Sequence, residues 1–244
     1  MIRAVLLALL VWAAPASAAE CENIRFEDAG YTICTVDLTS ETLRLFLYDD
    51  SGAPYGQFGA IESDLNDKGQ SLGFAMNAGM YHDDRAPVGH YVEDGQEIMR
   101  VIPNAGPGNF GLLPNGVLCI REGRADVIET LRFVKEAPDC AYATQSGPML
   151  VIDGALHPRF LKDSTSRYIR NGVGTSADGK TAVFAISDSP VTFYEFGRLY
   201  RDYLTLPNAL FLDGNISKLY APQLNRNDFG FSMGPVVGTV RAAD

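Results

Sequence analysis

The chain is poor in the side chains that metal and nucleic-acid sites need. Its 244 residues include three scattered histidines and four cysteines, with no C-x-x-C and no H-E-x-x-H, so no metal site is expected. Lysine and arginine number 20 against 30 aspartates and glutamates, a formal net charge of −10. An acidic chain is a poor non-specific ligand for nucleic acid or an anionic membrane. We expect neither partner, no P-loop, no dinucleotide-binding turn, no nucleophile elbow and no cofactor.

Long apolar runs are also lacking, apart from one at the N-terminus. Arg3 precedes the apolar run Ala4–Ala14, and the small residues Ala16–Ala18 follow it. This order is typical of a cleavable secretory signal, here over residues 1–19. The run is shorter than the roughly 20 residues that a transmembrane helix needs. The sequence therefore predicts a periplasmic or secreted mature chain, residues 20–244, without membrane insertion.

Four cysteines remain in the mature chain, and an oxidising compartment favours their pairing. Four cysteines allow three connectivities. We favour Cys21–Cys34 and Cys119–Cys140, because both close short local loops and the first pair ties down the new N-terminus.

Helical periodicity is scarce, and a period of two, typical of strands, predominates. Strands are expected over residues 42–48, 72–76, 88–93, 116–121, 149–153, 181–187 and 209–213. One helix is expected over 192–204, where Thr192-x-x-Glu195 fits a capping box, and a weaker one over 61–68. Many strands with few helices predict an α+β fold, mainly antiparallel sheet, in a single domain over residues 20–244.

Four segments place polar side chains at strand ends, where a rigid scaffold can present them to a ligand. In the first, Asn77 could hydrogen-bond a sugar hydroxyl, although a plain Asn-Ala-Gly turn is the alternative. In the second, Gln145 is a candidate substrate contact, and Ser146 as a nucleophile lacks an evident base. A turn that enters a strand is the competing interpretation of this second segment.

The other two segments carry charge. Arg170 precedes the glycine-rich stretch Asn171–Gly174, which suits bidentate recognition of phosphate or carboxylate, with an exposed salt bridge as the alternative. Asp213 ends an apolar strand, a common position for a catalytic carboxylate, but Asp213-Gly214 is also a frequent turn sequence.

Taken in order, eight segments resemble the phosphodiester glycosidase family, specifically its exported bacterial branch, over residues 74–240. The best-known member of this family is the mannose 6-phosphate uncovering enzyme, whose catalytic domain the chain resembles. The segments are NAGMY (77–81), PVGHYVEDG (87–95), NFGLLPNGV (109–117), QSGPMLVIDG (145–154), RNGVGTSADG (170–179), TFYEFGRLYRD (192–202), ALFLDGNISKLYAP (209–222) and MGPVVG (233–238).

The resemblance implies a hydrolase that cleaves the bond between a sugar C1 and a phosphodiester oxygen. Such a site needs a carboxylate at the anomeric carbon or its attacking water, and a cation at the phosphate. Asp213 is the first choice for the carboxylate and Glu195 the second, although Glu195 could serve only the helix cap. Arg170 is the choice for the phosphate clamp. Candidate substrate contacts are Asn77, Gln145, Ser146, Asn171, Gly214, Asn215 and Ser217.

The turn after Asp213 departs from the family pattern. The uncovering enzyme has Asp-Gly-Gly-Gly-Ser there, whereas this chain has Asp213-Gly214-Asn215-Ile216-Ser217. Glycines let a ligand approach the backbone closely. With two of them replaced, specificity for N-acetylglucosamine is not implied.

Three function classes follow. The leading hypothesis is a phosphodiester glycosidase that acts on an envelope or extracellular glycan, in carbohydrate metabolism. The second is a non-catalytic glycan-binding module on the same fold. The third is a metal-dependent phosphodiesterase that uses His82, Asp83, Asp84 and Asp188.

Overall fold

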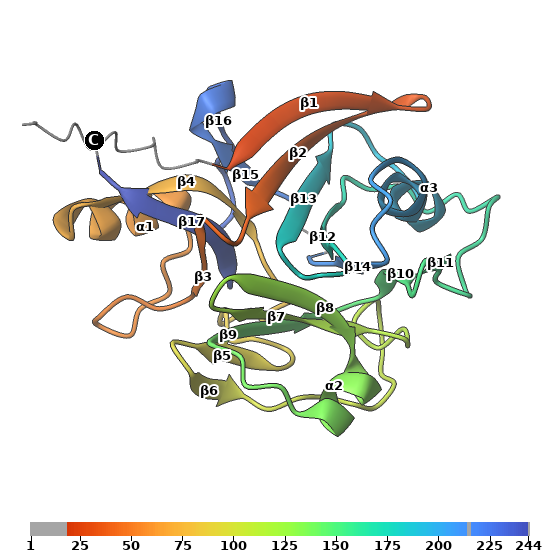
Figure 1. Cartoon of the computed structure of the whole chain (residues 1–244), viewed down its shortest axis with the longest axis horizontal. Coiled ribbons are helices and arrows are strands. Elements are labelled where there is room, and N and C mark those ends of the chain that lie inside the picture. Colours follow the sequence, from red (N-terminus) through yellow and green to blue (C-terminus); the bar gives the residue numbers. More distant parts are fainter. Residues whose placement is uncertain (1–18, 214–215, 244) are drawn as a thin grey trace, which may run out of the picture.

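Figure 1 shows the computed structural model, which describes residues 19–213 and 216–243. The secretory signal expected over residues 1–19 therefore lies, apart from Ala19, outside the described residues. The candidate contacts Gly214 and Asn215 also lie outside them. Within the described ranges, no helix has the length and apolarity needed to cross a membrane.

The fold consists mostly of antiparallel sheet, as the sequence predicts. The largest sheet has seven strands in the order β1-β2-β13-β12-β14-β10-β11. Its strands are β1 (Glu20–Phe26), β2 (Ala29–Asp37), β10 (Met149–Ile152), β11 (Ala155–Leu156), β12 (Asn171–Thr175), β13 (Thr181–Ser187) and β14 (Asn208–Phe211).

Two five-stranded sheets complete the β structure. The β4 sheet has the order β16-β15-β4-β17-β3, with β3 (Thr42–Phe46), β4 (Gln70–Asn77), β15 (Leu219–Ala221), β16 (Arg226–Asn227) and β17 (Val236–Ala242). The β9 sheet has the order β6-β5-β9-β7-β8, with β5 (Tyr91–Glu93), β6 (Gln96–Met99), β7 (Gly116–Arg121), β8 (Arg124–Glu129) and β9 (Tyr142–Ser146).

Helices are few and lie at the outside of the sheets (Figure 1). They are α1 (Phe58–Asp67), α2 (Thr130–Glu136) and α3 (Phe193–Arg198), which continues as the π-helix Leu199–Tyr203. A 3-10 turn covers Pro222–Leu224. The expected helix over 192–204 and its capping box are confirmed: the Thr192 side chain accepts from the Glu195 amide, and the Glu195 side chain accepts from the Thr192 amide.

One hydrophobic core joins the three sheets. Leu45 of β3, Met76 of β4, Leu118 of β7 and Phe184 of β13 are all fully buried in the same cluster. Burial of apolar area at roughly 25 cal/mol per Å² is the main favourable contribution to such packing. Because strands of all three sheets share this core, the loops at their ends are held in fixed positions relative to one another.

The two disulfides are the pairs that the sequence favours. Cys21 and Cys34 face each other across β1 and β2, with 4.0 Å between their Cα atoms. Cys119 of β7 is bonded to Cys140, with 5.5 Å between their Cα atoms. Disulfides of this kind persist in oxidising compartments.

Two segments spell enzyme motifs that the sequence analysis did not expect. Residues 174–181, GTSADGKT, match the letters of a P-loop, yet they form the turn between β12 and β13 with no helix after it. Residues 230–234, GFSMG, match the letters of a nucleophile elbow, but no helix follows Ser232. Neither segment has the strand–turn–helix geometry that gives these motifs their chemistry.

Candidate active site

A cavity of about 480 Å³ lies where segments from all three sheets meet. Asp213 enters it from just beyond β14, and Arg170 from just before β12. We call this cavity the Asp213 pocket. Its other lining residues follow β4, precede β5 or belong to loops and to α3: Met80, Tyr81, Val88, Gly108, Asn109, Ser166, Tyr168 and Phe193.

Arg170 is one of the largest buried side chains of the described chain, with 1% of its surface exposed. Its Nε donates to the Val191 carbonyl oxygen at 2.9 Å, and its Nη2 donates to the Ser166 carbonyl oxygen at 3.1 Å. The guanidinium carbon lies 3.6 Å from the centre of the Phe193 ring. Burial lowers the pKa of Arg170 to about 10, so the group is charged at neutral pH.

The Arg170 guanidinium retains donors for a ligand. A guanidinium has five N–H donors, and the contacts above use two of them. None of the ion pairs among the described residues involves Arg170. Burial disfavours its charged form, and the negative charge of Glu195 offsets this only in part, since the pKa of Arg170 is still lowered. Its place in a cavity wall therefore suits an anionic ligand such as phosphate.

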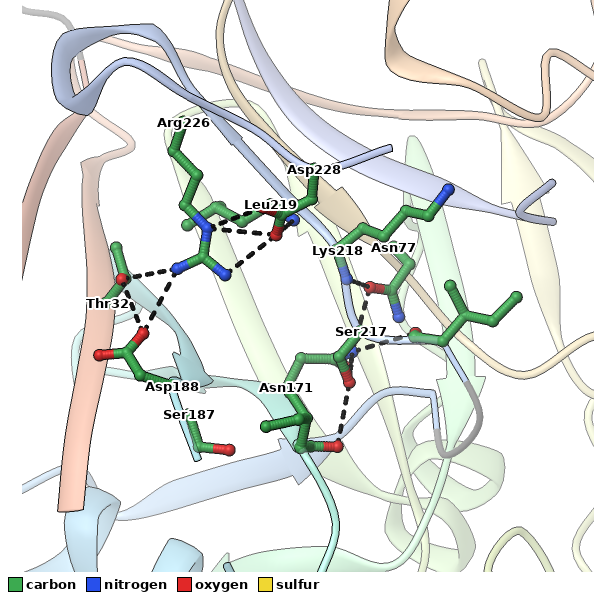
Figure 2. A network of polar contacts seen from close by, with 12 residues as sticks. Thr32, Asn77, Asn171, Ser187, Asp188, Ser217, Lys218, Leu219, Arg226 and Asp228 are labelled. Atoms are coloured by element: carbon green, nitrogen blue, oxygen red, sulfur yellow. Dashed lines mark hydrogen bonds and ion pairs between the residues drawn. The ribbon is translucent and has the colours of Figure 1, made fainter. Parts of the chain in front are cut away.

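Asp213 is held at the pocket by a buried asparagine. The Asp213 amide donates to Oδ1 of Asn171 at 3.2 Å, and Asp213 is 7% exposed. The Nδ2 of Asn171 donates to Oδ1 of Asn77 and to Oγ of Ser217, both at 3.0 Å. Figure 2 shows the side chains of Asn171, Asn77 and Ser217 converging. Asn171 thus contacts both Asp213 and Ser217.

The two buried asparagines bond to the backbone and to each other. Asn77 and Asn171 are both fully buried. Oδ1 of Asn77 also accepts from the Lys218 amide at 2.9 Å, and Ser217 Oγ donates to the Ile169 carbonyl oxygen at 3.2 Å. Neither asparagine is among the residues that line the Asp213 pocket. In this structure the side-chain oxygens of Asn77 and Ser217 bond to the protein itself, and sugar contacts by these two residues stay a prediction.

Gln145 and Ser146 also serve the scaffold. Oε1 of Gln145 accepts from the His90 and Ile102 amides, each at 3.0 Å, and its Nε2 donates to Ile102 and to Thr130. The Ser146 hydroxyl donates to the Leu212 carbonyl oxygen, directly before Asp213. Both side chains are buried and neither lines the pocket. Ser146, the last residue of β9, therefore holds the backbone of Leu212, the residue before Asp213.

Tyr81 brings a neutral hydroxyl near Asp213. Burial, followed by the negative charge of Asp213, raises the pKa of Tyr81 to about 12. Its hydroxyl donates to the Ser232 carbonyl oxygen at 3.4 Å. The ring lies so close to Gly234 that a Cβ there would be 2.4 Å from it. Glycine at 234 thus allows the close approach that sets the position of Tyr81.

Glu195 lies at a different cavity. Its carboxylate accepts from Arg167 at 2.6 and 3.0 Å and from the Thr192 amide at 2.8 Å. Burial alone would raise its pKa, but these hydrogen bonds outweigh burial and hold the pKa below its ordinary value. Glu195 and Arg167 line a cavity of about 190 Å³, which we call the Glu195 cavity. The structure does not place Glu195 among the residues of the Asp213 pocket.

The residues named for a metal-dependent phosphodiesterase do not come together as a set of metal ligands. Oδ1 of Asp188 accepts from Thr32 at 3.3 Å and from Arg226 at 3.5 Å (Figure 2). Across residues 19–213 and 216–243, no group of three or more His, Cys, Asp or Glu side chains could hold a metal ion. His82, Asp83 and Asp84 therefore do not join Asp188 in a metal site.

Several pocket residues escaped the analysis of the sequence. Tyr81, Asn109 and Phe193 lie inside the segments that carry the family resemblance, so their positions in NAGMY, NFGLL and TFYEF were the available signal. Ser166 and Tyr168 belong to the loop before β12, which has no periodic pattern. Only the fold shows that this loop reaches the pocket.

Comparison with known proteins gives a family and a fold. The family model described as phosphodiester glycosidase matches residues 70–236. The chain is 33% identical over 208 residues to "Uncharacterized protein YigE" of Escherichia coli K12, covering 84% of this chain and 81% of that protein.

Solved structures share the fold at low sequence identity. The catalytic domain of zebrafish N-acetylglucosamine-1-phosphodiester alpha-N-acetylglucosaminidase, auto-inhibited by its pro-peptide, superposes with a TM-score of 0.61 at 11% identity, over 93% of this chain and 84% of that one. A hypothetical protein from Synechocystis gives a TM-score of 0.59 at 12% identity over 90% of this chain. The matched part spans 61% of the Synechocystis protein.

Proposed function

The chain belongs to the phosphodiester glycosidase family, and we propose that it hydrolyses the bond between C1 of a sugar and a phosphodiester oxygen. The observation that carries this proposal is Arg170. It is a buried cation that lines the same pocket as Asp213, and none of the ion pairs among the described residues includes it. A pocket with a cation and a carboxylate matches a substrate that joins a phosphate to an anomeric carbon.

Arg170 binds the phosphate. Its Val191 and Ser166 contacts and the Phe193 ring fix the guanidinium plane, so little side-chain entropy is lost when an anion binds. The remaining N–H donors then meet the phosphodiester oxygens. As the glycosidic bond breaks, negative charge grows on the phosphate, and a preorganised cation stabilises that charge more than the ground state.

Asp213 acts at the anomeric carbon. Either its carboxylate deprotonates the attacking water or it forms a covalent glycosyl intermediate that water then hydrolyses. In both routes the C1–O bond breaks, a water oxygen becomes the new C1 hydroxyl, and the phosphate leaves as a monoester. The phosphate oxygen needs little protonation to leave, so a second carboxylate as general acid is not required. This is consistent with Glu195 lying at another cavity.

The surroundings of Asp213 keep its backbone fixed. Asn171 holds the Asp213 amide, and Ser146 holds the Leu212 carbonyl oxygen. Tyr168, 58% exposed, lies with its ring 5.5 Å from the Arg170 guanidinium carbon and presents an aromatic surface in the pocket wall. We propose that the Tyr168 ring packs against the apolar face of the sugar ring.

We propose that the substrate lies outside the cytoplasm. The disulfides Cys21–Cys34 and Cys119–Cys140 fit an oxidising compartment, and the N-terminal sequence has the form of a secretory signal. An envelope or extracellular glycan that contains sugar 1-phosphodiester linkages is therefore the proposed substrate. The name of the zebrafish protein specifies N-acetylglucosamine, whereas Asn215 and Ile216 depart from the family's sequence pattern, so assays of this chain begin with several sugars.

The test is hydrolysis in water enriched in the heavy oxygen isotope. Purified mature protein is incubated with methyl phosphodiesters and nucleoside diphosphate esters of several sugars, and the released sugar and phosphate are analysed by mass spectrometry. We expect the label at C1 of the sugar. Label in the phosphate would show attack at phosphorus and contradict the proposal. No release, together with measurable glycan binding, would favour the glycan-binding module.

A further inference from the structure

Arg170 is the first member of a stack of four planar side chains. Its guanidinium carbon lies 3.6 Å from the centre of the Phe193 ring. The Phe193 ring is nearly parallel to the Phe160 ring, with 5.2 Å between the ring centres and 6° between the planes. The Phe160 ring stacks in turn on His157, at 4.8 Å and 24°. Neither Phe160 nor His157 is among the described residues that line the Asp213 pocket, so this part of the stack reaches the pocket through Phe193.

Both faces of the Phe193 ring are covered. The guanidinium of Arg170 occupies one face, and a parallel ring whose centre is 5.2 Å away cannot fit beside it on that face. The Phe160 ring therefore lies on the opposite face. Phe211 crosses the Phe193 ring at 88°, with 4.9 Å between the centres. Cation–π attraction and offset ring stacking favour this arrangement, and a rotation of the Phe193 ring would break both contacts.

The segment between β11 and β12 brings Phe160 to this position, and both of its ends are tied to other elements. At its start, the His157 amide donates to the Leu150 carbonyl oxygen of β10 at 3.2 Å. At its end, Tyr168 and Val191 exchange two backbone hydrogen bonds, at 2.9 and 3.2 Å. Figure 1 shows β10 and β11 beside α3, the helix that supplies Phe193. The segment is thus held against the helix that it contacts.

A glycine in α3 permits this close packing. A Cβ at Gly197 would lie 3.0 Å from a methyl carbon of Leu156, 3.2 Å from the Leu150 carbonyl oxygen and 3.5 Å from the Phe160 ring. Glycine is unfavourable inside a helix. Its presence in α3 is explained by the space that the segment with Phe160 needs.

His157 ends the stack as a neutral ring. It is 2% exposed, and its Nδ1 accepts from the Arg159 amide at 3.2 Å. Burial lowers the pKa of His157 below its ordinary value. The stack therefore contains a single charge at neutral pH, that of Arg170, and no second cation repels it from within the stack.

We propose that Phe160 is a positioning residue of the phosphate site, which holds the Arg170 guanidinium in its plane by stacking on the far face of Phe193. The inference rests on the proposed function and deepens it. Phe160 acts through Phe193 and touches neither the substrate nor the guanidinium. Its flat ring keeps Phe193 parallel to the guanidinium, so that the remaining N–H donors of Arg170 point at the phosphate before it binds. A branched apolar side chain of similar volume fills the space and does not impose this plane.

The variants separate the ring of Phe160 from its volume. Phe160→Tyr keeps the flat ring, whereas Phe160→Leu keeps an apolar side chain without one. Phe26→Leu is the matched control, because Phe26 is also half-buried and also lies next to an arginine, with its ring centre 5.8 Å from the Arg198 guanidinium carbon. Phe26 does not line the Asp213 pocket. Thermal unfolding shows that each variant is folded.

The binding test uses inorganic phosphate and does not depend on turnover. Calorimetry on the mature protein should show a Kd for phosphate that rises about fivefold in Phe160→Leu. In Phe160→Tyr and Phe26→Leu it should stay within about twofold of wild type. Equal phosphate affinity of Phe160→Leu and wild type would overturn the inference, since volume alone would then be sufficient.

Nuclear magnetic resonance of the arginine side chains gives a second readout that needs neither a ligand nor a variant to interpret. The Nε signal of Arg170 is assigned by its loss in Arg170→Lys. We expect slow rotation about the Nε–Cζ bond of Arg170 in wild type, because the hydrogen bonds to Val191 and Ser166 and the Phe193 ring all oppose it. Phe160→Leu should speed this rotation by about tenfold. Fast rotation already in wild type would refute a fixed guanidinium plane.

Kinetics distinguish failure of the inference from failure of the proposed function. On a methyl phosphodiester, Phe160→Leu should lower kcat/KM by about tenfold and raise the inhibition constant of phosphate by about fivefold. A loss of kcat/KM with unchanged phosphate inhibition would contradict the inference and leave the proposed function standing. If wild type cleaves no substrate but phosphate affinity follows the expected order of the variants, the proposed function fails and the role of Phe160 stands.

Discussion

Arg167 and Arg170 are three residues apart, yet the fold uses them in opposite ways. Arg167 is half exposed and forms two hydrogen bonds with the Glu195 carboxylate in the Glu195 cavity. Arg170 is buried, binds only backbone carbonyl oxygens with its guanidinium, and lines the Asp213 pocket. The first arginine already pairs with a carboxylate, whereas we propose that the second binds the anion of a ligand. An arginine's burial and partners, and not its presence in a motif, indicate an anion site.

The largest expected effect is a difference in kcat between variants of Asp213 and of Glu195, the carboxylates of the two cavities. Asp213→Asn should lower kcat on a sugar 1-phosphodiester by about a thousandfold or more, because it removes the charge at the anomeric carbon. Glu195→Gln should leave kcat within about threefold. Steady-state kinetics measures both, with thermal unfolding as the check on folding. Comparable losses in the two variants would break the distinction between the cavities.

The second effect concerns the arginines themselves. Arg170→Lys should lower kcat/KM by about a hundredfold, because an ammonium cannot reproduce the planar donors fixed between Phe193 and the backbone. It should also weaken inhibition by inorganic phosphate. Arg167→Lys should change kcat/KM by less than about twofold. If Arg167→Lys weakens phosphate inhibition as strongly, the anion site includes both arginines.

The third prediction tests whether the capping box beside the Glu195 cavity serves stability and not activity. Thr192→Ala removes the side-chain half of the capping box and should cost about 1 kcal/mol in the free energy of unfolding. Urea denaturation measures this loss, and kcat/KM should stay within about twofold. Asp213→Asn serves as the converse control, with activity lost and stability retained. A Thr192→Ala variant of full stability and low activity would contradict the assignment.

The smallest effect is a pH dependence at Glu195. Hydrogen bonds from Thr192 and Arg167 outweigh burial and hold its pKa in the folded state below the ordinary value. The stabilisation is therefore present at pH values above the ordinary carboxyl pKa and is lost as the pH falls through the folded value. The stability gap between wild type and Glu195→Gln should shrink from about pH 7 to about pH 3, modestly, because the pair is partly exposed. A gap that does not change with pH would show that the Glu195 charge adds nothing.

Much of the fold could be predicted because the alternation of apolar residues and helix capping are set by neighbouring residues in the sequence. The period-two segments 116–121 and 181–187 coincide with β7 and β13, and the Thr192 capping box marks the start of α3. Helix α2 was missed because it has only seven residues and its N-cap is Glu129, an unusual capping residue. The hairpin of β1 and β2 was missed because polar residues interrupt its alternation.

The site was predictable in part, for a different reason. Asp213 and Arg170 could be chosen because a charged residue at a strand end is conspicuous in sequence. The hydrogen bonds that Asn77, Asn171 and Gln145 make within the protein could not be inferred, since sequence does not show which groups an amide side chain meets. Their hydrogen bonds join residues far apart in the chain, such as Asn77 and Lys218. Only tertiary structure decides between such roles.

The position of β17 in its sheet has a consequence for biosynthesis. Strand β17 comes after every other described strand in the sequence, yet it lies between β4 and β3, which both precede it by more than a hundred residues. During vectorial synthesis β3 and β4 therefore wait without their common neighbour until residues 236–242 emerge. Such a delay keeps the nascent chain open, which would suit the export that we propose for it. A bulky tag fused close to Ala242 would also hinder the pairing of β17 with β3 and β4, which completes this sheet.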